Sequence, residues 1–297
     1  MTLSSSGPPS GPHVAFDTPN ARALLGFMDD PGMRQFFALS GISADLLDRS
    51  AFDRAVNAAR AHVGAISTRP EAAETPLEHH PHLDALRGEP TFLEHAAGST
   101  GFDFAMVDLD RLVVAQPRVD LAHVDALRAR APEPGDADGL LRFCLPLQAE
   151  QPLDNFEIMT PTQTTLDLMV DNPDVRVCGF FQGSEPRSGR VMVGFFLGTG
   201  LRQMRVAKVG QRHILVNGYH RAVALMMKGH RKIPVILAQS AGLAGVPQPP
   251  DFFTPQMLLG PTPARVEDFV TTAAVDVIRT PIRRLFSVHT AIHPIPG

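Results

Sequence analysis

The chain has 297 residues, of which 44% are hydrophobic and 20% are charged. This balance is typical of a globular protein with a sizeable core, and it excludes an intrinsically disordered chain. The formal charge of −4 and the isoelectric point of about 6.3 lack the positive excess of proteins that bind duplex nucleic acid. We therefore expect no nucleic-acid partner.

The N-terminus and the cysteines predict a cellular location. The opening "MTLSSSGPPSGPH" lacks the basic start and apolar stretch of a signal peptide. No run approaches the ~20 apolar residues of a membrane span, so no membrane partner is expected. Cys144 and Cys178 are too few for a disulfide framework and predict two buried, reduced thiols. Together these features predict a cytoplasmic protein.

The first third of the chain divides into three segments by amino-acid composition and by the spacing of its apolar residues. Residues 1–16 are rich in Ser, Gly and Pro and predict a tail. Residues 17–68 predict a helical segment with helices over "DTPNARALLGFM", "MRQFFAL" and "SADLLDRSAFDRAVNAARAHV". Residues 69–101 are punctuated by Pro and predict a linker. This linker contains His79, His80 and His82, but Pro81 keeps them off a single helical face, so no metal site is expected.

Residues 102–240 predict a domain of mixed secondary structure, and hence an α+β fold. Strands are expected in "FAMVDLDRLVVAQP", "LLRFCLPL" and "KIPVIL", in a hairpin over 175–199, and in a pair around Gly210. Helices are expected in "VDLAHVDALRARA", "TPTQTTLDLMVDNPD" and "YHRAVALMMKG". Residues 241–297 predict a Pro-rich extension with one helix, "RVEDFVTTAAVDVIRT".

The helix that follows Gly218 predicts an anion site. It is apolar almost all round, which is typical of a buried helix, and Gly229 is a natural end to it. Its first-turn N–H groups and its dipole favour negative charge, and His220 and Arg221 lie in that turn. A phosphate or a carboxylate would suit this geometry. The alternative is structural: Arg221 pairs with a nearby acid and His220 bonds a backbone carbonyl.

The stretch "GYHRAVAL", with Gly229 and "IPVIL" behind it, resembles the signature of the ParB/sulfiredoxin superfamily. In that signature Gly, two variable residues, Arg and small residues open a helix, and a Gly and an IPV-type strand follow. "MVDLDRLVVAQPRVDLAHVDAL" is similar to the opening strand and helix of these domains, and "VAKVGQRHILVNG" to the strand pair before the signature. The resemblance covers roughly residues 102–239, with a large insertion.

The resemblance implies a small mixed β-sheet with packed helices and a turn that holds the phosphates of a nucleotide. Members of the superfamily use CTP, ATP or ADP, and Mg²⁺ accompanies the nucleotide where phosphate is transferred. The implied partner is a small phosphorylated molecule. The implied phosphate-binding and nucleotide-binding residues are Asn217, Gly218, Tyr219, His220 and Arg221, with Gln116 and Arg118 near a further contact.

Two departures narrow the implied activity. Sulfiredoxin places its reactive cysteine directly after the signature glycine, where this chain has Tyr219. A phenol with a pKa near ~10 does not replace a thiolate at neutral pH, which argues against sulfinic-acid reduction. Partition proteins continue into a helix-turn-helix module, whereas the last sixty residues here are interrupted by prolines, which argues against DNA partition.

The sequence leaves turnover open. Phosphoryl transfer or nucleotide hydrolysis would need a carboxylate as general base, and no pattern distinguishes one among the candidates. These candidates are Asp108, Asp110, Glu157, Asp167 and Glu185. The alternative is a nucleotide-sensing or scaffold module without turnover. The oligomeric state is also left open.

Overall fold

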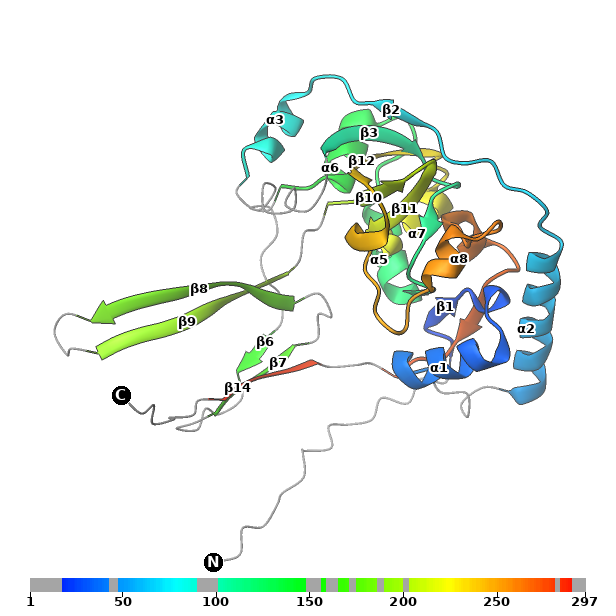
Figure 1. Cartoon of the computed structure of the whole chain (residues 1–297), viewed down its shortest axis with the longest axis horizontal. Helices are drawn as coiled ribbons and strands as arrows, with labels where there is room; N and C mark the ends of the chain where they lie inside the picture. The colour runs from blue at the N-terminus through cyan, green and yellow to red at the C-terminus, as the bar shows by residue number, and fades with distance from the viewer. Residues whose placement is uncertain are drawn as a thin grey trace, which may run out of the picture.

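The computed structural model describes residues 18–42, 48–89, 101–147, 156–158, 165–170, 175–185, 190–199, 203–280 and 284–289 (Figure 1). The fold is α+β, with small mixed sheets and packed helices, as the sequence predicts. The expected tail over residues 1–16 lies outside the described residues.

The helices and strands have the following bounds. The helices are α1 (Asp30–Ser40), α2 (Arg49–Gly64), α3 (Pro81–Arg87), α5 (Leu121–Arg130), α6 (Ala137–Cys144), α7 (Tyr219–Lys228) and α8 (Pro255–Leu259), with 3-10 turns η1 (Leu25–Phe27), η4 (Leu243–Gly245) and η5 (Val266–Val270). The strands are β1 (Ala21–Ala23), β2 (Glu74–Pro76), β3 (Phe102–Asp108), β4 (Val113–Val114), β5 (Arg118–Asp120), β6 (Phe156–Ile158), β7 (Thr165–Val170), β8 (Val175–Glu185), β9 (Arg190–Thr199), β10 (Arg205–Val209), β11 (Arg212–Asn217), β12 (Lys232–Ser240), β13 (Val275–Val277) and β14 (Arg284–His289).

The main sheet has six strands in the order β2-β3-β12-β10-β11-β4. It is mixed, because β10 runs parallel to β12 and β4 runs parallel to β11, whereas the other pairs are antiparallel. On β2, Glu74 Oε2 lies 2.5 Å from Nε2 of His213 on β11. In a flat sheet these strands would be about 19 Å apart, at ~4.8 Å per strand. The sheet therefore curls, and its two sides approach each other.

A second sheet joins distant parts of the chain. It has three short antiparallel strands in the order β13-β1-β5. Ala21 lies opposite Val277 on one side and Asp120 on the other. A strand near the start of the described chain and a strand of its last third thus pair beside β5, the strand that carries Arg118. The remaining sheets are β14-β7-β6 and the hairpin β8-β9, which stands away from the main body in Figure 1.

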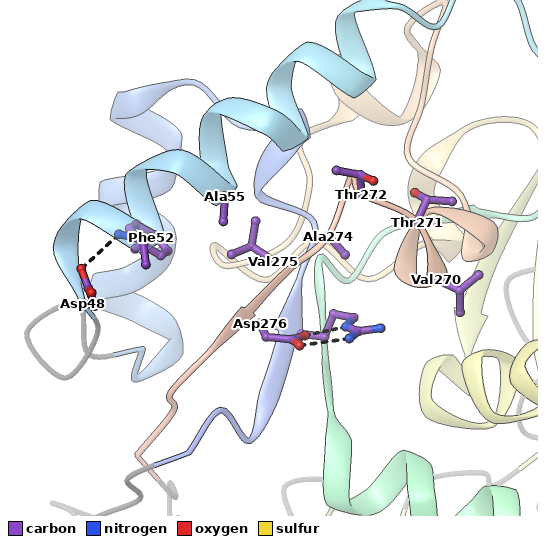
Figure 2. A pocket seen from close by; sticks show the side chains of 11 residues that line it. Asp48, Phe52, Ala55, Val270, Thr271, Thr272, Ala274, Val275 and Asp276 are labelled. Carbon is purple, nitrogen blue, oxygen red and sulfur yellow. Dashed lines mark hydrogen bonds and ion pairs between the residues drawn. The ribbon is translucent and has the colours of Figure 1, made fainter.

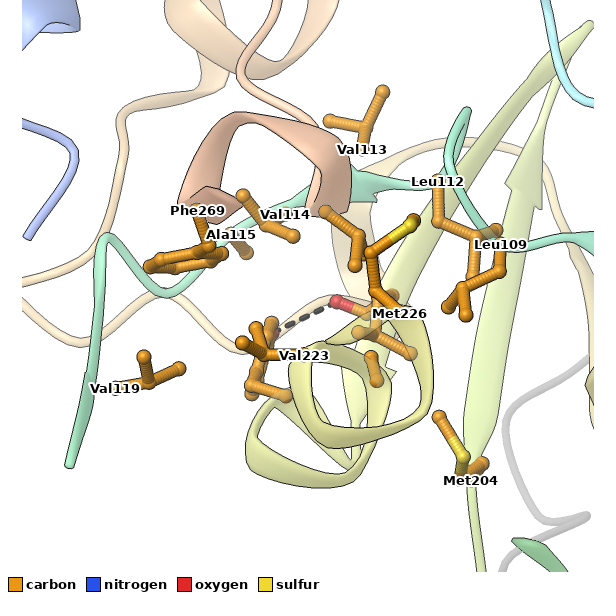
Figure 3. Packing of buried hydrophobic residues seen from close by; sticks show 14 of the residues in the cluster. Leu109, Leu112, Val113, Val114, Ala115, Val119, Met204, Val223, Met226 and Phe269 are labelled. Carbon is orange, nitrogen blue, oxygen red and sulfur yellow. Dashed lines mark hydrogen bonds between the residues drawn. The ribbon is translucent and has the colours of Figure 1, made fainter. Parts of the chain in front are cut away.

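Helix α7 lies in the core. Ala222, Val223, Ala224 and Leu225 are at most 2% exposed. Figure 3 shows Val223 and Met226 of α7 facing the side chains of the β4 region and η5. The helix also packs along α5. Because neighbours hold α7 on several sides, the position of its N-terminus is fixed by the fold.

Most of the elements that flank the site were predicted correctly. The strand pair β10-β11, the helix α7 and the strand β12 occur where the sequence places them, and so do β3, α5 and the hairpin β8-β9. The helices α1 and α2 are confirmed over their described residues. These elements have strong local signals, such as the left-handed glycines Gly210 and Gly229, with φ of 61° and 100°.

The prediction of a helix over "DTPNARALLGFM" was wrong. These residues form β1 and the turn η1. The strand pairs on both sides with segments about a hundred and more than two hundred and fifty residues away. This long-range pairing overrides a local helical propensity.

The prediction of a linker over residues 69–101 also needs correction. It contains β2, which extends the main sheet, and the helix α3. Pro81 does not prevent a helix here but opens it, at the position where its missing N–H costs nothing. His80 caps this helix, because its Nδ1 accepts a hydrogen bond from the backbone N–H of His82.

Three further segments were assigned the wrong type. The expected strand "LLRFCLPL" belongs largely to α6, whose buried Leu140, Leu141 and Cys144 follow helical spacing. The expected helix "TPTQTTLDLMVDNPD" contains β7, which pairs with β6 and β14. The expected C-terminal helix "RVEDFVTTAAVDVIRT" is the turn η5 followed by β13. In each case a short apolar run did not distinguish strand from helix.

Candidate functional site: a basic cluster at the start of helix α7

Helix α7 begins at Gly218, which has a left-handed backbone with φ of 98°. A Cβ at this position would lie 2.8 Å from Cγ of Met204, so the turn requires glycine for its conformation and for space. The preceding Asn217 donates from Nδ2 to the carbonyl of Gln203 at 2.9 Å. Because Gly218 has no side chain, the N-cap residue of α7 gives no side-chain hydrogen bond to the N–H groups of the first turn.

Tyr219 faces the interior. It is 6% exposed, and its hydroxyl donates to the carbonyl of Leu215 at 2.8 Å. Its ring meets that of Phe252 edge to face, with centroids 6.2 Å apart. Burial raises the pKa of the Tyr219 phenol above its ordinary value. Tyr219 therefore fixes the start of the helix and does not supply a phenolate.

Arg221 takes a structural position. Its Nη1 donates to the carbonyls of Phe143 and Cys144, at 3.0 and 3.2 Å. These carbonyls lie at the C-terminal end of α6, where the helix dipole favours a cation. The sequence did not predict this contact with backbone carbonyls, which occupies Nη1 of Arg221. At least one guanidinium nitrogen of Arg221 thus holds α7 against α6.

His220 contacts the neighbouring helix α5. Its ring lies edge to face with that of His123, with centroids 4.9 Å apart and planes at 80°. His123 is in the first turn of α5, which Asp120 caps. Two helix N-termini, each with a positive dipole end, therefore lie side by side.

Two arginines complete the positive field around His220. Burial, followed by the charges of His123, Arg118 and Arg279, lowers the pKa of His220 to about 3. All these neighbouring charges act in the same direction, so His220 is neutral at physiological pH in a positive surrounding. Burial and the nearby Arg279 also lower the pKa of Arg118 to about 10. We call Arg118, His123, His220 and Arg279 the basic cluster.

A carboxylate is bonded to the Arg118 member of this cluster. Asp251 Oδ2 accepts from Nη1 of Arg118 at 2.9 Å, and the two side chains are 18% and 17% exposed. Arg279 is held through Nε, which donates to the carbonyl of Ser40 at 3.0 Å. The side chain of Gln116 is engaged by the backbone of the cluster, because its Nε2 donates to the carbonyl of Arg118 at 2.6 Å.

The structure therefore brings together part of the predicted site. The charge of Arg118 acts on His220, although about a hundred residues separate them in the chain. Tyr219 bonds the carbonyl of Leu215, Nη1 of Arg221 bonds the end of α6, and Gln116 bonds the backbone of Arg118. Sequence reasoning missed His123, Asp251 and Arg279. His123 could have been found, because it lies in the first turn of a predicted helix. The position of Arg279 depends on the pairing of β13 with β1, which leaves no local signal.

The carboxylates considered as general bases lie elsewhere. Asp108 accepts from the backbone of Ala73 and pairs with Lys232, beyond the opposite end of α7. Asp110 lies near Glu267 of η5, whose pKa its charge helps to raise. Glu157, Asp167 and Glu185 lie on β6, β7 and β8, strands of other sheets.

The donor set of the basic cluster does not suit a metal ion held by the protein. Mg²⁺ prefers carboxylate and phosphate oxygens, and the carboxylate here is engaged by Arg118. Over the described ranges, no three His, Cys, Asp or Glu side chains are arranged to hold a metal. This includes the linker histidines, where His79 lies 2.9 Å from Asp84 and His82 lies 2.7 Å from the carbonyl of Leu145. Mg²⁺ at the basic cluster would have to be held by the phosphates of a nucleotide.

Cys144 is a buried thiol, as predicted. It is fully buried, and burial raises its pKa to about 12. Such a thiol is protonated at neutral pH and is a poor nucleophile. The side chain of Cys178 lies outside the described residues.

A cavity of 680 Å³ lies apart from this site, between α2 and the segment that joins η5 to β13 (Figure 2). It is wide open to solvent, and no member of the basic cluster lines it. Figure 2 shows Asp48 and Phe52 on one side and Thr271 and Thr272 on the other. At its rim Asp276 forms a two-bond ion pair with Arg22, at 2.6 and 3.0 Å. The paired charges leave little net field for an ionic ligand.

Comparison with known proteins adds no relative. No protein-family model, no curated protein and no solved structure matches this chain. None of the helices in the described ranges is both long and apolar enough to cross a bilayer.

Proposed function

We propose that this protein binds a nucleotide, or another phosphorylated small molecule, at the basic cluster and the start of α7. The observation that carries the proposal is the contact of His220 with His123 at two adjacent helix N-termini, under the positive charges of Arg118 and Arg279, in a protein whose formal charge is −4. Like charges gathered in a partly buried place repel one another, and an anion relieves that repulsion. The resemblance of the "GYHRAVAL" signature to the ParB/sulfiredoxin superfamily supports the same ligand class.

The contacts favour binding without turnover. Among the described residues, Asp251 is a carboxylate bonded to the cluster, and its Oδ2 is engaged by Nη1 of Arg118 at 2.9 Å. A general base must be free to accept a proton from the attacking group. We therefore place nucleotide sensing ahead of phosphoryl transfer or hydrolysis. The remaining alternative is a scaffold that binds no ligand. This hypothesis does not explain why positive charges are concentrated at the start of α7.

Calorimetric titration with CTP, ATP, ADP and GTP, with and without Mg²⁺, tests this proposal. We expect at least one of the four to bind, and Arg118→Ala to weaken that binding by about tenfold to a hundredfold, since it removes a charge-assisted hydrogen bond. Arg22→Ala is the matched control: Arg22 is also paired with an aspartate, on the adjacent strand of the same sheet. Loss of binding in both variants, or no binding by the native protein, would reject the proposal.

A further inference from the structure

Asp251 contacts the basic cluster and is followed by two residues that anchor its segment, one against α7 and one against the chain beside β4. The next residue, Phe252, places its ring against Tyr219 at the start of α7. Phe253 is 3% exposed, and its N–H donates to the carbonyl of Ala115 at 2.9 Å. These anchors fix the backbone of Asp251 beside Arg118. The segment thus presents a carboxylate to the cluster at a defined position.

The carboxylate does not fully offset the positive surroundings of Arg118. Burial and the charge of Arg279 lower the pKa of Arg118 to about 10 although Asp251 lies beside it. Asp120, on the same strand as Arg118, is engaged as the cap of α5, where it accepts from the backbone N–H of His123. A phosphate with two charges and three oxygens would match two guanidinium groups better than one carboxylate does.

We propose that Asp251 occupies the phosphate position on Arg118 in the ligand-free protein, and that a bound phosphate group takes its place. This inference rests on the proposed function. Displacement requires a change in the Asp251 side chain, because the anchors at Phe252 and Phe253 hold the backbone. The side chain is 18% exposed, so it lies close enough to solvent to be hydrated after it leaves Arg118.

This exchange has a consequence for specificity. A ligand must bind Arg118 more strongly than the Asp251 carboxylate does, so weak or singly charged anions cannot displace this carboxylate. Polyphosphates can displace it because they carry more charge and reach more than one cation. Asp251 thereby acts as a built-in competitor that selects for phosphorylated ligands.

Titration calorimetry with inorganic tripolyphosphate tests the exchange, because this probe needs no knowledge of the base. Asp251→Asn keeps the shape and removes the charge, and we expect it to bind tripolyphosphate about tenfold more tightly than the native protein. Asp251→Glu, which keeps the charge, should bind like the native protein. Asp276→Asn removes the same charge from the Arg22 pair, which lies in the same sheet but is not part of the basic cluster, and should leave the affinity within a few-fold of the native value.

The outcomes separate the two proposals. Tighter binding by Asp251→Asn, or binding by that variant alone, supports the exchange. Binding by the native protein that is equal or weaker in Asp251→Asn rejects the exchange and leaves the phosphate site standing. No binding by either protein rejects the phosphate site, and the exchange with it. Circular dichroism of each variant confirms that the comparison is between folded proteins.

Discussion

His123 and His220 lie edge to face with ring centroids 4.9 Å apart, and they join the first turns of α5 and α7. Each ring sits at the positive end of a helix dipole, and the charges of Arg118 and Arg279 act on His220. Contacts between cationic groups are unfavourable unless one partner stays neutral or an anion is present. The histidine pair therefore lies where the fold concentrates positive charge.

Acid should destabilise the protein through His220. Its pKa is about 3 in the folded protein, against 6.5 for an unperturbed histidine, so between these values the unfolded chain binds a proton that the folded state does not. The stability contributed by neutral His220 is complete above pH 6.5 and is lost as the pH falls toward 3, at up to ~1.4 kcal/mol per pH unit. Urea unfolding at several pH values measures this slope.

The variant His220→Gln isolates that contribution. Its stability should fall less steeply with acid than that of the native protein. His62→Gln, on the exposed face of α2, is the control and should leave the slope unchanged. Equal slopes for His220→Gln and the native protein would contradict the assignment.

Gly218→Ala should destabilise the protein by about 2–4 kcal/mol. The positive φ costs about 1–2 kcal/mol for a residue with a Cβ, and the contact with Met204 adds a packing cost. Gly210→Ala is the matched control, because its φ is 61° and nothing lies within 4 Å of the added Cβ. Urea unfolding should therefore show a clearly smaller loss for Gly210→Ala, and similar losses would contradict the account of the turn.

Arg221→Ala should lower stability more than ligand affinity. It removes two hydrogen bonds to the end of α6, each worth about 1–3 kcal/mol when the donor is charged. Affinity for tripolyphosphate should stay within a few-fold of the native value, in contrast to Arg118→Ala. Parallel urea unfolding and calorimetry measure both quantities. An Arg221→Ala protein with native stability that no longer binds tripolyphosphate would contradict this account and would show that Arg221 binds the phosphate.

The buried ion pair between Arg69 and Asp268 should contribute strongly to stability. Two bonds of 2.6 Å join the side chains, which are 9% and 1% exposed. Arg69→Met leaves the Asp268 carboxylate buried without this partner and should cost about 3–5 kcal/mol. Arg49→Met breaks the exposed pair with Asp53 and should cost less than about 1 kcal/mol. Comparable losses in urea unfolding would contradict this distinction.

The sequence predicted those elements whose signals are local. Gly218 and Gly229 bracket an apolar run, and this pattern located α7 correctly at both ends. The turn at Gly210 likewise located the strand pair β10-β11. The sequence predicts such positions because the required backbone conformation and burial depend on residues that are close together in the chain.

The sequence did not predict what depends on distant pairing. Ala21–Ala23 form a strand because β5 and β13 lie on either side, and neither partner is visible from the local pattern. The same pairing brings Arg279 toward Arg118, which no spacing rule could indicate. The contact of Arg221 with backbone carbonyls was not predicted for a related reason, since the segment assigned as a strand is α6, whose end supplies those carbonyls.

The most direct test of the phosphate site is a titration of the protein followed by the ring signals of its histidines in NMR spectra, with His220→Gln and His123→Gln to assign the two signals. Addition of a nucleotide or tripolyphosphate should shift the signals of His220 and His123 more than those of the other histidines, and should raise the pKa of His220, because an anion offsets the charges of Arg118 and Arg279. Unchanged signals of both residues at saturating ligand would contradict a phosphate site at the start of α7.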